Sequence, residues 1–180
     1  MFMQVRIPIF IRGALRRRRS ARPTFVFADL VGFTEATERM GDEAAAQLAR
    51  EFRRTMCAIS CRAGARQVKS MGDGVMIWAH DPAVAIEIAA QALAHESGGG
   101  GLLPVRIGVH TGAAIRDGRD WYGTAVNVAA RLAAQAGPNE ALVSSSTRAA
   151  AASRSTKSLS DRRELSLRGI ARPVTAWRLA

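Results

Sequence analysis

A Gly-Asp-Gly turn at residues 72–74 stands between two apolar runs, and it constrains the fold more than any other feature of the sequence. Glycine permits backbone conformations closed to other residues, so the chain can reverse here and present the Asp73 carboxylate on a protruding tip. The pattern predicts a β-hairpin over residues 66–79 with a chemically active group at its turn.

Lys69 stands four residues before that aspartate. Of the 26 basic residues in the chain, only Lys69 and Lys157 are lysines. A compact ammonium differs from a flat guanidinium fork as a hydrogen-bond donor, so its use beside the turn indicates a specific contact.

The remaining apolar periodicities predict alternating strands and helices. We expect strands at 24–31, 103–115, 140–144, 164–168 and 173–179, and helices at 43–61, 82–96, 122–135 and 145–152. A shorter helix should precede residue 40, and Thr34 is a candidate for its N-cap. Residues 144–160 are Ser- and Ala-rich and suggest a mobile excursion. This order predicts an α+β fold in which helices pack on one antiparallel sheet.

Length and charge divide the chain into a tail and one domain. The 180 residues, 48% of them apolar, suffice for a single core over 23–180. Residues 1–22 hold seven of the arginines and no acid, so the net charge of +11 falls to 19 minus 15, or +4, without them. We interpret this tail as a linker-like arm, with weak contact to a membrane surface or another polyanion as the alternative. Neither a signal peptide nor a membrane-spanning segment is recognisable, which favours a cytoplasmic location.

The cysteines and histidines give little indication of chemistry. Cys57 and Cys61 lie four residues apart on an expected helix, and the chain has no other cysteine with which to complete a zinc site. We expect both to be buried free thiols. His80, His95 and His110 are scattered over unlike elements and are weak catalytic candidates.

Two aspartates are the best metal candidates. Asp29 ends an apolar strand, where a lone carboxylate is costly to bury unless it is paired or binds a cation. Asp73 at the hairpin turn could join it in holding divalent ions against a triphosphate, while Gly32 and Phe33 offer backbone amides at a helix start. The alternatives are a solvated or helix-capping Asp29 and an ordinary turn at Asp73.

A second polar group surrounds the helix expected at 122–135. Asn127 and Arg131 are four residues apart and project from one helical face, and Asp120 lies just before that helix. Taken alone, this face favours ordinary solvation over function, because Asn and Arg on a helix surface are usually just solvated.

Four segments together resemble the catalytic domain of class III adenylate and guanylate cyclases. They are residues 27–34 (FADLVGFT), 69–74 (KSMGDG), 108–112 (GVHTG) and 120–131 (DWYGTAVNVAAR), in the order of that family. The resemblance covers roughly residues 24–179 and implies a ferredoxin-like antiparallel sheet with helices packed on it. The short layout is similar to bacterial members, in particular actinobacterial ones.

The resemblance implies a role for each site residue. Asp29 and Asp73 would ligate two Mg²⁺ or Mn²⁺ ions per active site, and Gly32 and Phe33 would lie at the phosphates. Arg131 would stabilise the transition-state phosphate and Asn127 would orient the ribose. Arg168 stands where the family often has a lysine that contacts the terminal phosphate, a replacement that keeps the charge and changes the contact geometry.

Hydrogen-bonding chemistry favours ATP over GTP. Adenine offers an acceptor at N1 and a donor at its amino group, which match the Lys69 ammonium and the Asp120 carboxylate. Guanine reverses both, and a buried mismatch of this kind can cost on the order of 10⁴ in selectivity. The Lys and Asp pair is also the adenylate type in the family.

The resemblance further implies a head-to-tail homodimer with ATP as substrate. Asp29 and Asp73 of one chain would face the other four polar residues of its partner, namely Lys69, Asp120, Asn127 and Arg131. The sequence thus predicts an adenylate cyclase that makes 3′,5′-cyclic AMP and pyrophosphate. A guanylate cyclase, or a catalytically silent nucleotide- or nucleic-acid-binding module, is the alternative, although no specific nucleic-acid partner is expected.

Overall fold

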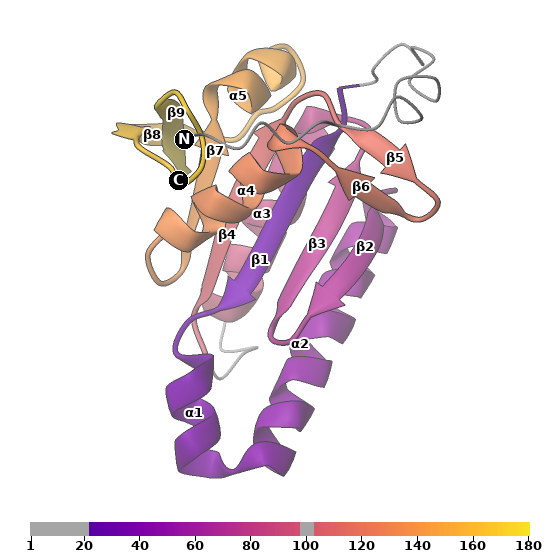
Figure 1. Cartoon of the computed structure of the whole chain (residues 1–180), viewed down its shortest axis with the longest axis vertical. Coiled ribbons are helices and arrows are strands. Elements are labelled where there is room, and N and C mark those ends of the chain that lie inside the picture. Colours follow the sequence, from indigo (N-terminus) through magenta and orange to yellow (C-terminus); the bar gives the residue numbers. More distant parts are fainter. Residues whose placement is uncertain (1–21, 98–102) are drawn as a thin grey trace, which may run out of the picture.

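The computed structural model describes residues 22–97 and 103–180 (Figure 1). Its strands are β1 (Thr24–Leu30), β2 (Arg66–Met71), β3 (Gly74–Ala79), β4 (Val105–Thr111), β5 (Ile115–Asp117), β6 (Asp120–Tyr122), β7 (Glu140–Ser144), β8 (Leu159–Leu165) and β9 (Val174–Leu179). Its helices are α1 (Phe33–Met40), α2 (Asp42–Arg62), α3 (Pro82–Ser97), α4 (Thr124–Gln135) and α5 (Ser145–Ala151). None of these helices has the length and apolarity needed to cross a bilayer.

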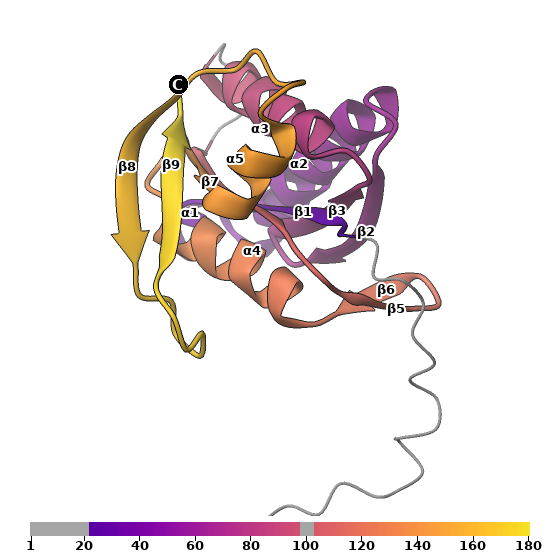
Figure 2. The same ribbon diagram turned by 90° about the horizontal axis from the view of Figure 1, so that it is seen from above.

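Seven strands form one sheet in the order β2-β3-β1-β4-β7-β9-β8, and β5 pairs with β6 in a separate hairpin. Every pairing in the large sheet is antiparallel except that of β4 with β7. Helices α2 and α3 cover one face of the sheet, whereas α4 covers the other (Figure 2). The predicted α+β class with helices on a largely antiparallel sheet is therefore confirmed.

Alternation along β1 supplies both faces of the sheet with apolar side chains. Val26, Ala28 and Leu30 belong to the core beneath α2 and α3, together with Phe52 and Met56. Phe25 and Phe27 point to the opposite face and pack with α4 residues and Trp121. A strand buried on both sides explains why residues 24–30 read as a continuous apolar run.

Gly108 allows α4 to lie directly on β4. A Cβ built at this position would fall 2.2 Å from the Ala129 carbonyl oxygen and 2.3 Å from the Ala133 nitrogen. Both contacts are with backbone atoms, which cannot rotate away as a flexible side chain could. The absence of a side chain at residue 108 thus sets the distance between α4 and the sheet.

Several expected boundaries differ from the observed ones. Helix α4 begins at Thr124 and not at residue 122, because residues 120–122 pair with β5 to form the second hairpin. The strand expected at 164–168 runs from Leu159 to Leu165, paired along its length with β9. The strand expected at 103–115 ends at Thr111.

Two further expectations concerned loops and caps. The segment 144–160, expected as a mobile excursion, contains the end of β7, helix α5, a connection at 152–158 and the start of β8, and Thr147 and Ala151 of α5 are buried. Thr34 does not cap α1: the helix begins at Phe33, and Gly32 occupies the N-cap position with a left-handed φ of 74°. Most of the Arg-rich tail, residues 1–21, lies outside the described residues, as does the Gly-rich stretch 98–101.

Both cysteines are exposed, so the expectation of buried thiols was wrong. The buried side of α2 carries Phe52, Met56 and Ile59. Cys57 follows Met56 by one residue, which turns it about 100° around the helix axis, away from the core. Cys61 lies one turn further along the same face, and the two Sγ atoms are 3.8 Å apart.

His110 on β4 gives the fold a predictable pH dependence. Burial lowers the pKa of its imidazole from 6.5 to about 4, while its Nδ1 lies 2.9 Å from Ser144 Oγ. The unfolded chain therefore binds a proton between pH 6.5 and 4 that the folded chain does not. Stability from this group is complete above pH 6.5 and declines as the pH falls, by at most about 1.4 kcal/mol per pH unit.

We expect urea unfolding to show this decline between pH 7 and pH 5, and the His110→Gln protein to show less of it. Other groups titrate in the same range in both proteins, so the difference between the two slopes isolates the imidazole. Equal slopes would contradict a neutral, buried His110.

Candidate active site

The two aspartates predicted to bind metal lie side by side. Strands β1 and β3 pair so that Asp29 is opposite Gly74, the residue that follows Asp73. A Cβ at residue 74 would lie 3.0 Å from Asp29 Oδ1, so glycine there leaves room for this carboxylate. Gly72, with a φ of 62°, makes the turn that carries Asp73 to the same place.

The electrostatics of this pair favour a bound cation. Burial, followed by the negative charge of Asp29, raises the pKa of the Asp73 carboxyl above its usual 3.8. Two carboxylates in one half-buried place repel each other, and a divalent ion would relieve that repulsion. Carboxylate oxygens are also the donors that Mg²⁺ and Mn²⁺ prefer.

The described residues contain no cluster of three or more His, Cys, Asp or Glu that could bind a metal. Asp29 and Asp73 would therefore supply only part of a coordination shell, and the rest must come from backbone oxygens, water or substrate. Mg²⁺ is commonly held in this way, by one or two carboxylates plus phosphate oxygens. The donor set fits an ion that binds together with a phosphorylated substrate.

Arg106 is a member of this site that the sequence analysis missed. It lies on β4, opposite Asp29 in the β1–β4 register. Its Nη2 and Nε donate to Asp29 Oδ2 at 2.6 and 3.1 Å. The only sequence signal was a charged residue between buried Val105 and Ile107, and its partner is 77 residues away along the chain.

Lys69 and Asp120 form a second polar pair. The Lys69 ammonium on β2 donates to both carboxylate oxygens of Asp120 on β6, at 2.8 and 2.9 Å. Hydrogen bonds from Lys69, and then from the Trp121 amide, lower the pKa of the Asp120 carboxyl. The amide contact to Asp120 Oδ1 measures 2.7 Å. A charged donor and a charged acceptor thus lie next to each other, as the prediction for base recognition requires.

An aromatic cluster positions β6. Trp121 is buried, with its ring centroid 5.7 Å from that of Phe25 and 5.4 Å from that of Trp78. Phe25 belongs to β1 and Trp78 to β3, so the small hairpin is anchored to the large sheet. This anchoring holds Asp120, the neighbour of Trp121, within reach of Lys69.

Asn127 and Arg131 are both exposed on the face of α4 that points away from the sheet. The opposite side of the helix, with Val128, Ala129 and Leu132, is buried. The two side chains are one helical turn apart, as predicted. Neither side chain forms a hydrogen bond or ion pair with another residue that the structure describes.

The remaining candidates lie apart from one another. Gly32 is the N-cap residue of α1 and Phe33 begins that helix, three and four residues after Asp29. Arg168 is exposed in the connection between β8 and β9. In the sheet order β4, β7 and β9 separate β1 from β8, so a single chain does not bring Arg168 to the aspartates.

The chain matches the family described as the adenylate and guanylate cyclase catalytic domain over residues 16–180. It belongs to that family. Among curated relatives, an adenylate cyclase of Streptomyces coelicolor is 37% identical over 121 residues, which are 65% of this chain and 31% of the relative. An adenylate cyclase of Streptomyces griseus is 35% identical over 122 residues, which are 68% of this chain and 31% of the relative. The cyclase domain thus spans about a third of the length of these relatives.

A solved structure supports the fold. The adenylyl cyclase CyaB from P. aeruginosa superimposes with a TM-score of 0.75 at 23% identity, covering 88% of this chain and 93% of that chain. The resemblance to class III cyclases noted in the sequence is therefore confirmed for family and fold. The roles of individual residues stay predictions.

Within one cyclase domain the polar residues form two separate groups. The aspartates and Arg106 lie at the end of the sheet nearest α1, whereas the β5–β6 hairpin lies toward the opposite end (Figure 1). The first group holds two carboxylates and a guanidinium, and the second an ammonium and a carboxylate. The two groups therefore lie at different places on one chain.

Proposed function

We propose that this cyclase domain converts ATP to 3′,5′-cyclic AMP and pyrophosphate. In this reaction the ribose 3′-oxygen bonds to the α-phosphorus, the bond from that phosphorus to the bridging oxygen breaks, and the 3′-hydroxyl proton is released. The observation that carries the proposal is the pairing of Asp29 and Asp73, with Arg106 against the first of them.

Asp29 and Asp73 would hold two divalent ions, Mg²⁺ or Mn²⁺. Such ions acidify an attacking hydroxyl and neutralise charge on a triphosphate. The raised pKa of Asp73 supports this assignment, because burial and the neighbouring charge of Asp29 disfavour its ionised form even with Arg106 nearby, and a divalent ion would favour it. Arg106 remains beside Asp29 as a fixed guanidinium, suited to the phosphate oxygens that arrive with the ions.

The other residues would bind and orient the rest of the substrate. Arg131 stabilises charge that develops on the α-phosphate, and Asn127 orients the ribose. The backbone amides at Gly32 and Phe33, at the N-terminal end of α1, suit phosphate oxygens. Arg168 contacts the terminal phosphate.

Lys69 and Asp120 would select adenine. The ammonium donates to N1 and the carboxylate accepts from the 6-amino group. Their mutual contacts at 2.8 and 2.9 Å show that both groups reach the same point, as recognition of two adjacent atoms on one base edge demands. A purine inserted between them would replace that ion pair by two charge-assisted hydrogen bonds.

The sites would be shared across a head-to-tail homodimer. Asp29 and Asp73 of one chain would face Lys69, Asp120, Asn127 and Arg131 of the other chain. The separation of the two groups within a chain, and the exposure of the α4 residues, support this arrangement. Two equivalent sites would result from the two-fold symmetry.

The direct test is product formation by the purified chain. With Mn²⁺ we expect ATP to yield cyclic AMP, and GTP supplied in parallel to yield far less cyclic GMP. The rate per chain should rise with protein concentration until dimers predominate. Absence of cyclic AMP at every concentration would refute the proposal, and preferential use of GTP would indicate a guanylate cyclase.

A double variant tests the base contacts in the same assay. We expect Lys69→Glu with Asp120→Cys to lower the ratio of ATP turnover to GTP turnover by at least about tenfold, because both hydrogen-bonding partners of adenine are lost. An unchanged ratio would show that these residues do not read the base.

A further inference from the structure

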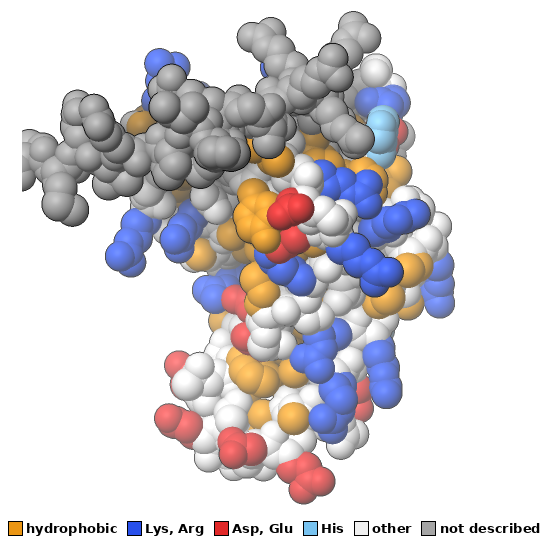
Figure 3. Space-filling view, turned by 45° about the vertical axis from the view of Figure 1, so that its right-hand side comes forward, with side chains coloured by type: hydrophobic (Ala, Val, Ile, Leu, Met, Phe, Trp, Pro, Cys, Tyr) orange, Lys and Arg blue, Asp and Glu red, His pale blue; other side chains and the backbone are white. Residues whose placement is uncertain are grey.

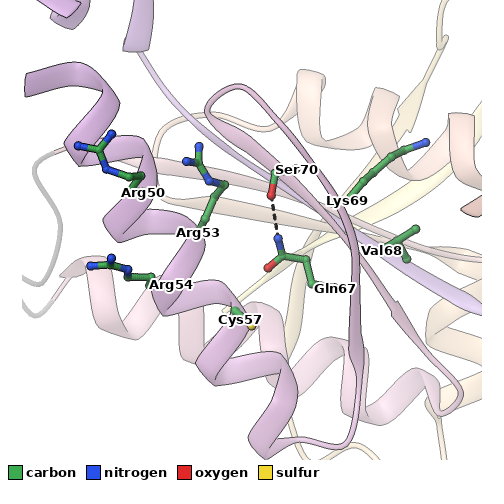
Figure 4. Close-up of a pocket in the computed structure, with 8 residues that line it drawn as sticks. All are labelled: Arg50, Arg53, Arg54, Cys57, Gln67, Val68, Lys69 and Ser70. Atoms are coloured by element: carbon green, nitrogen blue, oxygen red, sulfur yellow. Dashed lines mark hydrogen bonds between the residues drawn. The ribbon is translucent and has the colours of Figure 1, made fainter. Parts of the chain in front are cut away.

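A cleft of about 520 Å³ lies between α2 and β2, on the edge of the sheet (Figure 4). Its lining residues come from one face of the helix and from the edge strand: Arg50, Arg53, Arg54, Cys57, Gln67, Val68, Lys69 and Ser70. The volume is comparable to that of small-molecule sites, about 300–1,000 Å³, although this cleft is shallow and largely open to solvent. The metal-site aspartates do not line it, so this cleft is separate from their site.

The charge of the cleft is one-sided. Arg50 precedes Arg53 by three residues and Arg54 by four, so each of the two later side chains lies next to that of Arg50 on the helix surface. No acidic side chain lines the cleft, and none of the three forms an ion pair with another described residue. Figure 3 shows several basic side chains gathered along this side of the molecule, whereas acidic side chains lie mostly at its lower end and in one group in its upper half.

Like charges one turn apart destabilise a helix unless something neutralises them. Guanidinium groups donate in pairs to phosphate oxygens, and helix positions three and four apart have Cβ atoms about 5–6 Å from each other. Three such groups therefore suit an anion larger than a single phosphate. We infer that the α2–β2 cleft binds a diphosphate group, either pyrophosphate itself or the diphosphate of a nucleotide.

A bound diphosphate would also reach the hairpin that carries Asp73. Arg53 Nη1 donates to the Gly72 carbonyl oxygen at 2.9 Å, and Gly72 directly precedes Asp73. Lys69 also lines the cleft, and its ammonium donates to Asp120. An anion that engages Arg53 thus competes for a contact that holds this turn. The importance of that link for turnover rests on the proposed function, whereas binding itself does not.

Cys57 provides a reporter inside the cleft. In the Cys61→Ser protein it is the sole thiol, because the chain has only these two cysteines. We would measure its modification by the neutral reagent N-ethylmaleimide, in chelator and at constant ionic strength, with pyrophosphate or ADP as the anion. We expect each to slow modification saturably, and inorganic phosphate to do so only at much higher concentration.

Two charge-matched double variants test whether anion binding in the cleft causes the protection of Cys57. Arg50→Gln with Arg54→Gln should weaken protection by about 10²-fold, at about tenfold for each lost charge-assisted contact. Arg39→Gln with Arg172→Gln removes the same charge from exposed positions elsewhere and should leave protection nearly unchanged. Equal effects of the two pairs, or no protection in the parent protein, would overturn the inference.

The link to the hairpin has its own readout. Backbone amide resonances of residues 72–74 should shift along the same saturation curve as the Cys57 protection. Unmoved amides would overturn that link. None of these measurements requires turnover of ATP, so failure of this inference and failure of the proposed function are distinguishable.

Discussion

Replacing Asp73 by Asn is expected to lower cyclic AMP formation by about 10³-fold, because divalent ions contribute several kcal/mol to reactions of this type and the amide is a poor ligand for them. The same change should leave the fold at least as stable at neutral pH. Burial and the charge of Asp29 raise the pKa of the Asp73 carboxyl, so its ionised form opposes folding above that pKa, and a neutral amide removes this opposition.

Turnover and thermal unfolding, measured with and without Mn²⁺, test both halves of this expectation. Mn²⁺ should raise the unfolding temperature of the parent protein but have little effect on the Asp73→Asn protein. Glu38→Gln, which removes one negative charge from an exposed position on α1, serves as the matched control and should retain activity. Full activity of the Asp73→Asn protein would remove this residue from the site.

The second large effect is recovery of activity from two inactive proteins. Asp29→Asn removes a proposed metal ligand, and Arg131→Ala removes the guanidinium on α4 that is proposed to contact the α-phosphate. In a shared-site dimer, a mixed pair keeps one intact site out of two. Since random exchange makes half of the dimers mixed, the mixture should regain about a quarter of the parent activity per chain.

A mixture of Asp29→Asn and Asp73→Asn chains provides the control. Both changes fall on the same half of the site, so each mixed dimer has one defect in either site and no activity should return. Subunit exchange is checked by mass measurement of differently tagged chains. Mixed dimers of the first kind without activity would refute sharing of the site.

The hairpin at residues 66–79 was predictable because its signals are local. Two glycines around Asp73 mark a turn, and the apolar runs beside them can only pair with each other. The apolar run at residues 24–30 likewise predicted a buried strand, which is β1. Predictions of this kind depend on neighbours in sequence, and the structure agrees with them.

Contacts set by strand register were not predictable in this way. The Arg106–Asp29 pair depends on how β1 aligns with β4, which no local pattern specifies. The β5–β6 hairpin was missed because its strands have three residues each, too few to show alternation, and because Tyr122 was assigned to the helix that follows. Its anchoring through Trp121 is a tertiary effect.

The cysteines show a different limit. Helical periodicity predicted a helix at 43–61, and Leu48, Phe52 and Met56 lie on the buried side of α2. Cys57 and Cys61 were nevertheless assigned to the interior because free cysteines are usually buried. Their position relative to Met56 already placed them outside the apolar stripe, so the geometric argument should have outweighed the general tendency.

The close contact of α4 with Gly108 means that the positions of the Asn127 and Arg131 side chains depend on a residue of β4. Any substituent at position 108 would have to lift the helix off the strand, since the obstacles are main-chain atoms of Ala129 and Ala133. Asn127 and Arg131 would then be displaced outward together, with their identities unchanged. A larger residue at position 108 would therefore be expected to move both side chains that the proposal assigns to the substrate, without contacting the substrate itself.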